Sequence, residues 1–272
     1  MSKFQNKRII ITGASSGIGK EMAIQLARQG SRLTLASRGV ERLAEVAHLC
    51  QENGAEAIHI PTDVADESQC KELIQASVNH YGGIDMLVNN AGYSMWAKFE
   101  DITQMEIGEH LFKVKFFGSV YCTYAALPFL KASKGQILAI SSITGKIGVP
   151  SRTYYSAANH ALAGFFDSLR SEVYGDGVKI TMVYPGFIAT PIRENAINSD
   201  GKPHGKTHID ENKAMPVDIC VRHILEAAAI QKRDVYLTVK EKVGIWLKLI
   251  SPSLLDFIAR KQTSFDQLSD TK

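Results

Sequence analysis

The sequence predicts an α/β protein in which helices cover both faces of a parallel, doubly wound sheet of about seven strands. Two observations support this prediction. Short apolar runs, of the kind found in strands that are buried on both faces, alternate along the chain with amphipathic segments of helical length. A glycine-rich turn also joins the first apolar run to the first helical segment, as is typical of open α/β sheets.

The predicted strands are short, and several are rich in β-branched residues, as the strands of a central parallel sheet usually are. They cover residues 8–12, 33–36, 57–60, 86–89, 137–140, 179–183 and 235–239, the last as an edge strand. Helical segments fill the intervals, beginning with residues 20–29, 40–53 and 67–80. Gly30 follows the first helical segment, where a glycine can end a helix.

Length and composition suit one sizeable core. The chain has 272 residues, of which 45% are apolar and 22% charged, and no linker or repeat divides it. Residues 1–272 are therefore predicted to form a single domain. The net charge of +3 is small and the basic residues are dispersed, which argues against nucleic-acid binding.

The expected location is cytoplasmic. The four cysteines have no metal or redox spacing, so we expect buried thiols of a reducing compartment. The N-terminal residues lead directly into the first strand and leave no room for a signal sequence. No segment approaches the ~20 apolar residues that a membrane-spanning helix requires.

The segment Thr12-Gly-Ala-Ser-Ser-Gly-Ile-Gly19 joins the first strand to the first helix. Glycine is needed where the backbone turns tightly and must approach a pyrophosphate closely. The helix that follows offers free N–H groups and the positive end of its dipole to phosphate. Because the motif lies between a strand and a helix, it favours a dinucleotide site over an ordinary strand-to-helix turn.

Four further segments belong to the same pattern. They are Asn89-Asn90-Ala91-Gly92 after the fourth strand, Ser141-Ser142 after the fifth, Tyr155 placed 13 residues after Ser142, and Pro185-Gly186 with Thr190 after the sixth. Taken together, these motifs resemble the short-chain dehydrogenase/reductase family over residues 7 to 240. The resemblance implies a Rossmann fold, a dinucleotide-binding and catalytic core at residues 7–190, and assembly into a homodimer or a homotetramer.

The residues after the second strand indicate which dinucleotide is bound. NAD-specific sites place an acidic residue there, which accepts hydrogen bonds from the ribose hydroxyls, but this chain has Ala36-Ser37-Arg38-Gly39. Arg38 can bind a 2′-phosphate through two charge-assisted hydrogen bonds, with Ser37 and Ser15 as further donors. A solvated loop arginine is the alternative, but the missing acid favours NADP(H) as the cofactor.

The resemblance assigns the cofactor contacts residue by residue. They are expected at Gly13, Ser15, Ser16, Gly17, Ile18, Gly19, Ser37, Arg38, Asp63, Val64, Asn90, Ala91, Gly92, Asn159, Pro185, Gly186, Ile188 and Thr190. Asp63 and Val64 are the expected adenine contacts. Capping of the following helix is a second role open to Asp63.

Catalysis in that family uses an asparagine, a serine, a tyrosine and a lysine. The tyrosine gives a proton to the carbonyl oxygen as hydride leaves the nicotinamide, and the serine hydrogen-bonds the same oxygen. The lysine lies one helical turn after the tyrosine, binds the nicotinamide ribose and lowers the pKa of the tyrosine. Ser142 and Tyr155 match in type and spacing, and the 13-residue interval selects Tyr155 over Tyr154.

Two positions depart from the family pattern, and their residue types have changed places. Asn159 stands where the lysine is expected, and Lys115 stands where the asparagine is expected. The helical neighbours of Lys115 are mostly small: Leu111, Gly118, Ser119 and Cys122. We therefore expect Lys115 to point inward, because a solvated face carries more charged residues and a buried lysine without a role is costly.

Three accounts of this exchange stay open. In the first, Lys115 supplies the missing charge near Tyr155 and Asn159 takes the contact with the ribose or with water. The result is a weakened enzyme biased toward carbonyl reduction, because reduction needs the protonated tyrosine. In the second, the protein binds NADP with little or no turnover and acts as a sensor or scaffold. In the third, the two residues were substituted deliberately.

The implied substrate is a small carbonyl compound or the corresponding alcohol, in contact with Ser142 and Tyr155. Tyr93, Ser94 and Trp96, with Met95 between them, follow the Asn-Asn-Ala-Gly turn and are candidates to line an apolar pocket. Packing beneath a lid is the alternative for these side chains. A hydrophobic ketone or aldehyde is the substrate class that they favour.

A substrate lid is expected at residues 191–215, which are polar and contain glycine. His204 and His208 lie four residues apart in this segment. Because the segment is predicted to be a loop, the pair does not share a helix face, and no metal site is expected.

Residues 240–262 form an amphipathic C-terminal extension of two short helices, separated at Ser251-Pro252-Ser253. Five apolar residues are predicted to share one face: Trp246, Leu247, Ile250, Leu254 and Phe257. Basic residues surround that face, namely Lys242, Lys248, Arg260 and Lys261. One interpretation is a flap packed against the substrate mouth or a neighbouring subunit. The other is a peripheral contact with a membrane through residues 243–259.

Overall fold

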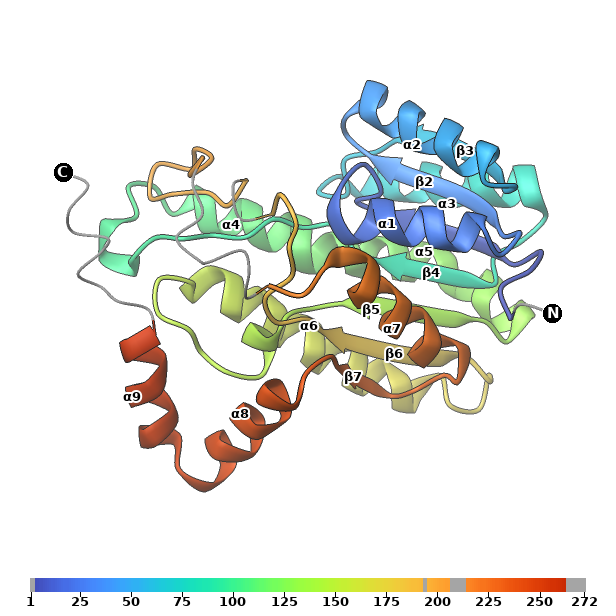
Figure 1. Cartoon of the computed structure of the whole chain (residues 1–272). Helices are drawn as coiled ribbons and strands as arrows, with labels where there is room; N and C mark the ends of the chain where they lie inside the picture. Colours follow the sequence, from blue (N-terminus) through green and yellow to red (C-terminus); the bar gives the residue numbers. More distant parts are fainter. Residues whose placement is uncertain (1–2, 193–194, 206–213, 263–272) are drawn as a thin grey trace.

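The computed structural model describes residues 3–192, 195–205 and 214–262, which form a central sheet covered by helices (Figure 1). Seven parallel strands follow the order β3-β2-β1-β4-β5-β6-β7. Their bounds are β1 Arg8–Thr12, β2 Arg32–Ser37, β3 Glu56–Pro61, β4 Met86–Asn89, β5 Gln136–Ile140, β6 Lys179–Tyr184 and β7 Asp234–Tyr236. The strand order reverses beside β1, which confirms the predicted doubly wound fold.

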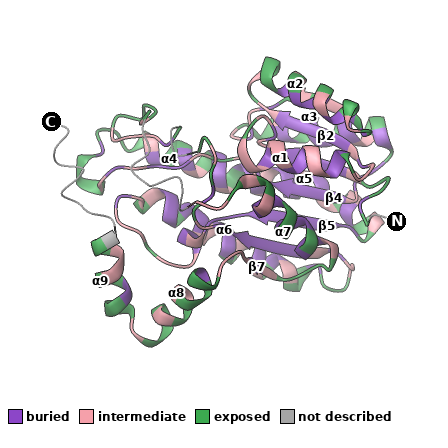
Figure 2. Cartoon of the chain, in the orientation of Figure 1, coloured by how far each residue is buried: buried purple, intermediate pink, exposed green. Residues whose placement is uncertain are grey.

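Helices cover both faces of the sheet. One face carries α1 (Gly17–Ala27), α2 (Val40–Glu52) and α7 (Val217–Ala229), and the other carries α3 (Glu67–Tyr81), α5 (Gly118–Ser133) and α6 (Thr153–Glu172). Side chains of β1 alternate between the two apolar cores, since Ile9 and Ile11 join the first and Ile10 the second. Figure 2 shows the strands buried between the helix layers.

The helical stretch before β5 contains an irregular turn. Helix α4 (Glu106–Phe112) continues through a π-helical turn at Lys113–Phe117 into α5, with helical backbone angles at each junction. Turns of π-helix are rare in proteins, but those that occur often lie at functional sites. Lys115 lies at the centre of this turn.

Two predicted boundaries are wrong. The first helix begins at Gly17 rather than residue 20, because Ser16 already has the extended conformation of an N-cap and the helix starts inside the glycine motif. The last strand ends at Tyr236 rather than residue 239. Thr238 and Glu241 form a capping box that starts α8 (Val239–Ile250) at the next residue.

The C-terminal extension consists of α8 and α9 (Pro252–Gln262), separated at Ser251 as the sequence predicts. Figure 1 shows the two helices as a V that projects beyond the carboxyl edge of the sheet. Among the residues that the structure describes, no helix is long and apolar enough to cross a membrane.

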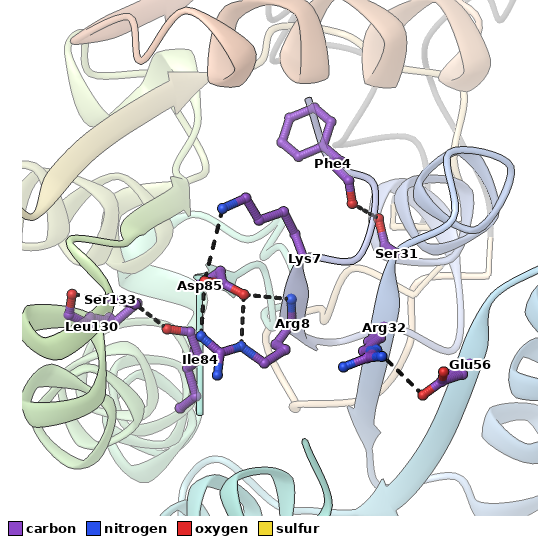
Figure 3. Close-up of polar contacts among 10 residues, drawn as sticks. All are labelled: Phe4, Lys7, Arg8, Ser31, Arg32, Glu56, Ile84, Asp85, Leu130 and Ser133. Atoms are coloured by element: carbon purple, nitrogen blue, oxygen red, sulfur yellow. Dashed lines mark hydrogen bonds and ion pairs between the residues drawn. The ribbon is translucent and has the colours of Figure 1, made fainter. Parts of the chain in front are cut away.

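Polar contacts hold the opposite, amino edge of the sheet together (Figure 3). Arg8 donates Nε to Asp85 Oδ2 at 2.8 Å and Nη2 to Oδ1 at 3.0 Å, and its backbone N–H also bonds Asp85 at 2.9 Å. Burial opposes ionisation of Asp85, but the hydrogen bonds from Arg8 hold the pKa of that carboxyl below its usual value. These contacts join the amino ends of β1 and β4, whereas the larger cavity lies at the carboxyl edge.

Candidate active site

A cavity of about 2300 Å³ lies along the carboxyl ends of the strands. Residues that follow β1, β2, β3, β4, β5 and β6 line it, together with residues between 192 and 216 and residues of the C-terminal helices. Ordinary ligand pockets measure roughly 300–1,000 Å³. The cavity can therefore hold a dinucleotide and a second ligand at the place where open α/β sheets bind nucleotides.

Most of the predicted contact residues line this cavity; the exceptions are Gly19, Met95 and Asn159. Gly19 lies behind the turn, where an added Cβ would collide with the carbonyl oxygen of Gly13. Met95 is fully buried in an apolar cluster with Tyr155 and Ala158. Of the two alternatives for Met95, packing therefore holds and pocket lining does not, because the strand-like alternation of this segment turns it away from its neighbours Ser94 and Trp96.

The glycine turn is hydrogen-bonded to Asn90, the residue that follows β4. Asn90 donates its side-chain amide to the carbonyl oxygens of Thr12 at 2.9 Å and Gly13 at 3.1 Å. Thr12 Oγ1 in turn accepts the backbone N–H groups of Asn90 and Ala91. Gly13 has φ +65°, and a Cβ on it would lie 2.8 Å from the Cα of Ala91. The result is a bare backbone surface at the start of α1, a geometry that fits the pyrophosphate of a dinucleotide.

Two arginines line the cavity at the end of β2. Ser37 and Arg38 lie where the sequence places them, and no carboxylate stands at that strand end. Arg42, in the first turn of α2, also lines the cavity, which the sequence argument missed. Its position four residues after Arg38 was the available signal, because residues so spaced near the start of a helix reach the same side.

Asp63 lines the cavity but does not cap the next helix. The N-cap of α3 is Asp66, whose side chain accepts the backbone N–H groups of Ser68 and Gln69. Asp63 instead accepts the backbone N–H of Ala65 at 3.0 Å. The capping role considered for Asp63 is therefore wrong, and its carboxylate remains at the cavity wall.

Ser142 and Tyr155 line the same cavity. Ser142 follows β5 and caps a 3₁₀ turn at Ile143–Gly145, since its Oγ accepts the Thr144 N–H at 3.2 Å. Its hydroxyl lies 3.5 Å from the carbonyl oxygen of Pro185. Tyr155 lies in the first turn of α6 and is buried. Two hydroxyl groups from different elements thus reach one cavity.

Lys115 points inward, as its helical neighbours predict. Only 4% of its surface is exposed, and its Nζ donates a 2.6 Å hydrogen bond to the carbonyl oxygen of Ile140. The stem packs against Gly92, where a Cβ would lie 2.7 Å from Lys115 Cδ. Burial lowers the pKa of the Lys115 ammonium to about 8. A buried cation thus lines the cavity that Ser142 and Tyr155 share.

Asn159 lies one helical turn after Tyr155 and is completely buried. Its Nδ2 donates to the Tyr155 carbonyl oxygen at 2.8 Å, and its Oδ1 accepts from Ser141 Oγ at 3.1 Å. These bonds tie the start of α6 to the end of β5. They turn the side chain away from the cavity, which Asn159 does not line.

The substrate side of the cavity has its own polar pairs. Tyr93 OH and His110 Nδ1 lie 2.7 Å apart, and burial raises the pKa of Tyr93 to about 12. The Arg152 guanidinium stacks 4.5 Å from the centre of the Trp96 ring, and its Nη1 lies 3.4 Å from Ser94 Oγ. His110 and Arg152 were not predicted, because they come from other elements and belong to no motif in the sequence.

The described part of residues 191–215, where a lid is expected, is paired with this wall of the cavity. Trp96 donates its backbone N–H to the Ile197 carbonyl at 2.8 Å, and Ile197 donates to Ser94 at 2.9 Å. His208 lies outside the described residues. Within the described ranges, no group of His, Cys, Asp or Glu has the arrangement of a metal site.

The C-terminal helices have apolar residues on two sides. Val243, Leu247, Leu255 and Ile258 line the cavity. The outer side exposes Trp246, Leu249, Ile250, Leu254 and Phe257. The prediction that Leu247 shares one face with Trp246, Ile250, Leu254 and Phe257 is therefore wrong, because Leu247 lines the cavity and the other four are exposed and do not.

Known proteins that are similar to this chain identify its family. The family model described as short chain dehydrogenase matches residues 7–200 of the chain. The chain belongs to the short-chain dehydrogenase family. This family consists of oxidoreductases.

Several named short-chain dehydrogenases are similar to this chain. An Arabidopsis thaliana protein named 11-beta-hydroxysteroid dehydrogenase-like 2 is 43% identical over 185 residues, which cover 68% of this chain and 60% of that protein. A Dictyostelium discoideum protein named dehydrogenase/reductase SDR family protein 7-like is 34% identical over 271 residues, covering 97% and 84%. The chain therefore spans less than two thirds of the Arabidopsis relative's length.

Solved structures show the same fold. A short-chain dehydrogenase/reductase from Burkholderia phymatum in complex with NAD has a TM-score of 0.82 at 22% identity, over 93% of this chain and 96% of that chain. An alcohol dehydrogenase from Thermococcus sibiricus complexed with 5-hydroxy-NADP has a TM-score of 0.70 at 26% identity, over 84% and 94%. The first of these structures holds NAD and the second holds 5-hydroxy-NADP.

Proposed function

We propose that this short-chain dehydrogenase is an NADP(H)-dependent reductase of hydrophobic ketones or aldehydes. The observation that carries the proposal is the shared cavity: Ser142, Tyr155 and the buried Lys115 line one part of it, and a glycine cradle with two arginines lines another. Hydroxyl groups, a cation and a dinucleotide site are the components that carbonyl reduction needs.

NADP(H) fits the residues at the end of β2 better than NAD(H). Arg38 and Arg42 line the cavity there, with the Ser37 and Ser15 hydroxyls as further donors. A guanidinium binds phosphate through paired, charge-assisted hydrogen bonds. No carboxylate stands at this strand end to accept the ribose hydroxyls of NAD.

When bound, NADPH supplies the hydride. The Tyr155 hydroxyl gives its proton to the carbonyl oxygen of the substrate, and the Ser142 hydroxyl donates a hydrogen bond to the same oxygen. The Tyr93 ring and the apolar residues of α8 and α9 exclude water from the reacting groups, which strengthens these polar interactions.

Lys115 takes the electrostatic part that the family lysine plays. With a pKa of about 8, its side chain is mostly an ammonium at pH 7. A cation in this buried cavity stabilises the negative charge that develops on the tyrosine and carbonyl oxygens during proton transfer. The Lys115 ammonium also offers an N–H donor to the nicotinamide ribose.

Asn159 acts as a positioning residue. Its bonds to the Tyr155 carbonyl and to Ser141 hold the first turn of α6 against the end of β5. The tyrosine hydroxyl is thereby fixed relative to Ser142, which follows Ser141 directly. Asn159 is completely buried and does not line the cavity, so the ribose contact that the exchange suggested would require its side chain to move.

Dinucleotide binding without turnover is the second candidate. The observation that favours it is the 2.6 Å bond from Lys115 Nζ to Ile140, which occupies one N–H of the ammonium with a backbone carbonyl. An ammonium has three donors, so two remain for other partners. We favour the enzyme because the remaining donors belong to a side chain that lines the cavity.

The substrate proposed is a hydrophobic molecule of about steroid size. Apolar side chains of α8 and α9 wall the cavity beside Tyr93 and Trp96. The name of the Arabidopsis relative refers to a hydroxysteroid, which is a substrate of this class.

We also propose that α8 and α9 contact an anionic membrane surface, at which such a substrate concentrates. Five large apolar side chains are exposed on their outer side. Five basic residues and two acidic ones lie between residues 239 and 262: Lys240, Lys242, Lys248, Arg260 and Lys261 against Glu241 and Asp256. An apolar face bordered by cations suits a bilayer with anionic headgroups. The protein would then be cytoplasmic and peripheral at the membrane.

The test of the enzymatic proposal combines binding and turnover. NADPH and NADH are titrated by fluorescence, and NADPH oxidation is followed with a ketosteroid and an aromatic diketone as probes. The expected result is tighter binding of NADPH and substrate-dependent oxidation. NADPH binding without oxidation by either probe, in a protein whose fold is intact, would favour the non-catalytic candidate.

A further inference from the structure

The carboxylate of Glu241 joins two parts of the molecule that are far apart in sequence. Its Oε2 accepts the backbone N–H groups of Leu237 at 2.7 Å and Thr238 at 3.0 Å, which cap the start of α8. The backbone N–H of Gly186, in the turn after β6, also hydrogen-bonds this carboxylate. A Cβ on Gly186 would collide with Glu241 Oε1.

This contact is more than helix capping requires. A capping box needs one side-chain oxygen that accepts the backbone N–H of the N-cap residue. Glu241 Oε2 already accepts the N–H of Thr238. The other oxygen reaches out of α8 to Gly186, and only 8% of the Glu241 surface is exposed. Within the described ranges, no salt bridge involves Glu241, so backbone N–H groups are what compensates its burial.

The turn that Glu241 holds belongs to the cofactor part of the cavity. Pro185 and Gly186 line the cavity, as do Ile188 and Thr190 that follow them. A Cβ at residue 186 would force the Glu241 carboxylate to move, because the carboxylate occupies that space. Gly186 lacks a Cβ and Glu241 ends in a carboxylate, and both features permit this close contact.

We infer that Glu241 is a positioning residue for the dinucleotide: it fixes the Pro185–Gly186 turn to the first turn of α8 in the form that binds the nicotinamide end. This inference rests on the proposed NADP(H) function. It makes the C-terminal helices part of the cofactor site, because the helix that carries the cavity-lining Leu247 and the exposed Trp246 begins at the same anchor.

Two variants separate this role from helix capping. In Glu241→Gln, the single amide oxygen can still accept the Leu237 and Thr238 N–H groups, but the amide NH₂ then faces the N–H of Gly186. Thr238→Ala is the matched control, since it removes the other half of the capping box and leaves the carboxylate on Gly186. The readouts are the NADPH Kd by fluorescence, the hydrogen-exchange rate of the Gly186 amide in the free protein, and Tm.

We expect Glu241→Gln to raise the NADPH Kd about tenfold and to speed exchange of the Gly186 amide about as much, from the loss of one charge-assisted hydrogen bond. Thr238→Ala should lower Tm and leave exchange of the Gly186 amide at the wild-type rate; the NADPH Kd is not its readout, because Thr238 itself lines the cavity. Wild-type Kd and Gly186 exchange in Glu241→Gln would overturn the inference, and so would equally fast Gly186 exchange in both variants.

If Glu241→Gln does not fold, Glu241→Asp keeps the charge in the first turn of α8 but is one methylene too short to reach Gly186, and it should raise the Kd in the same way; an unchanged Kd would overturn the inference. Failure of the wild-type protein to bind NADPH would instead contradict the proposed function. The exchange rate of Gly186 in the free protein would then still decide whether Glu241 holds the turn.

Discussion

Lys115 Nζ donates a 2.6 Å hydrogen bond to the carbonyl oxygen of Ile140, the last residue of β5. Asn159 approaches the next residue, since its Oδ1 accepts the Ser141 hydroxyl at 3.1 Å. The two exchanged residues therefore meet the same strand end from two helical segments. The lysine lines the cavity and the asparagine is buried behind it.

This arrangement predicts that the exchange can be reversed. Lys115→Asn alone should lower kcat for ketone reduction by about 100-fold, because it removes the cation from the site. Adding Asn159→Lys, which restores the family arrangement, should recover kcat to within about tenfold of the wild type. Steady-state kinetics with saturating NADPH measure both. A double variant as slow as Lys115→Asn would show that the two positions are not equivalent.

Burial of Lys115 predicts a pH dependence of stability. The folded-state pKa is lowered from 10.5 to about 8, so the folded protein binds fewer protons than the unfolded chain between these values. The buried ammonium thus costs stability below pH 8, and the cost disappears as pH rises toward 10.5. Replacing Lys115 should remove this cost at neutral pH.

The test of that dependence is urea unfolding of the cofactor-free protein at pH 7 and pH 10. The free energy of unfolding of Lys115→Met at pH 7 should exceed that of the wild type by about 2 kcal/mol. Removing the buried charge contributes up to about 3 kcal/mol, and the Ile140 carbonyl that loses its donor costs about 1 kcal/mol. The advantage should vanish at pH 10. The exposed Lys232→Met is the control. An equal difference at both pH values would contradict the burial of a charged lysine.

The arginines at the end of β2 predict selectivity for the 2′-phosphate. Arg38→Ala should raise the Kd of NADPH by about 10- to 100-fold and leave that of NADH nearly unchanged, because charge-assisted bonds to the phosphate are lost. Arg42→Ala should act in the same direction. Isothermal titration of both dinucleotides measures the effect. Equal weakening of NADPH and NADH would show that the arginines do not read the 2′-phosphate.

Much of this site follows from sequence because its residues lie in local motifs. The glycine turn, Asn90, Ser142 and Tyr155 each follow a strand or open a helix at fixed spacing, and parallel strands bring their carboxyl ends to one edge. The inward direction of Lys115 was also predictable from its helical neighbours, whose register places small residues around it.

Other features depend on contacts between distant segments, and these the sequence could not show. In the sequence, Glu241 is one residue of a predicted amphipathic tail and belongs to no motif. Its bond to Gly186 exists because α8 starts beside the turn after β6. Asn159 was expected at the ribose, but Ser141, 18 residues away, draws its side chain to the buried side. Leu247 was misplaced because helical periodicity does not say which side of a helix faces the cavity.

The exposed side of α8 and α9 predicts binding to anionic membranes. Replacing Trp246 and Ile250 by serine should lower co-sedimentation with vesicles containing phosphatidylserine at least about tenfold, because apolar burial drives such binding. Tyr174→Ser is the control, since Tyr174 is 78% exposed and Ile250 79%, but Tyr174 lies near the end of α6. Unchanged sedimentation, or an equal loss in the control, would remove the membrane contact.

The central claim is that Lys115 performs the catalytic work of the missing family lysine. A single-turnover measurement tests it most directly: enzyme saturated with NADPH is mixed with a ketosteroid or an aromatic diketone at pH 7, and NADPH oxidation is followed in the wild type and in Lys115→Met. We predict a rate at least about 100-fold lower in Lys115→Met, with the NADPH Kd raised no more than about tenfold by the loss of one hydrogen bond to the ribose. Equal rates in the two proteins, or no oxidation in the wild type, would contradict the claim.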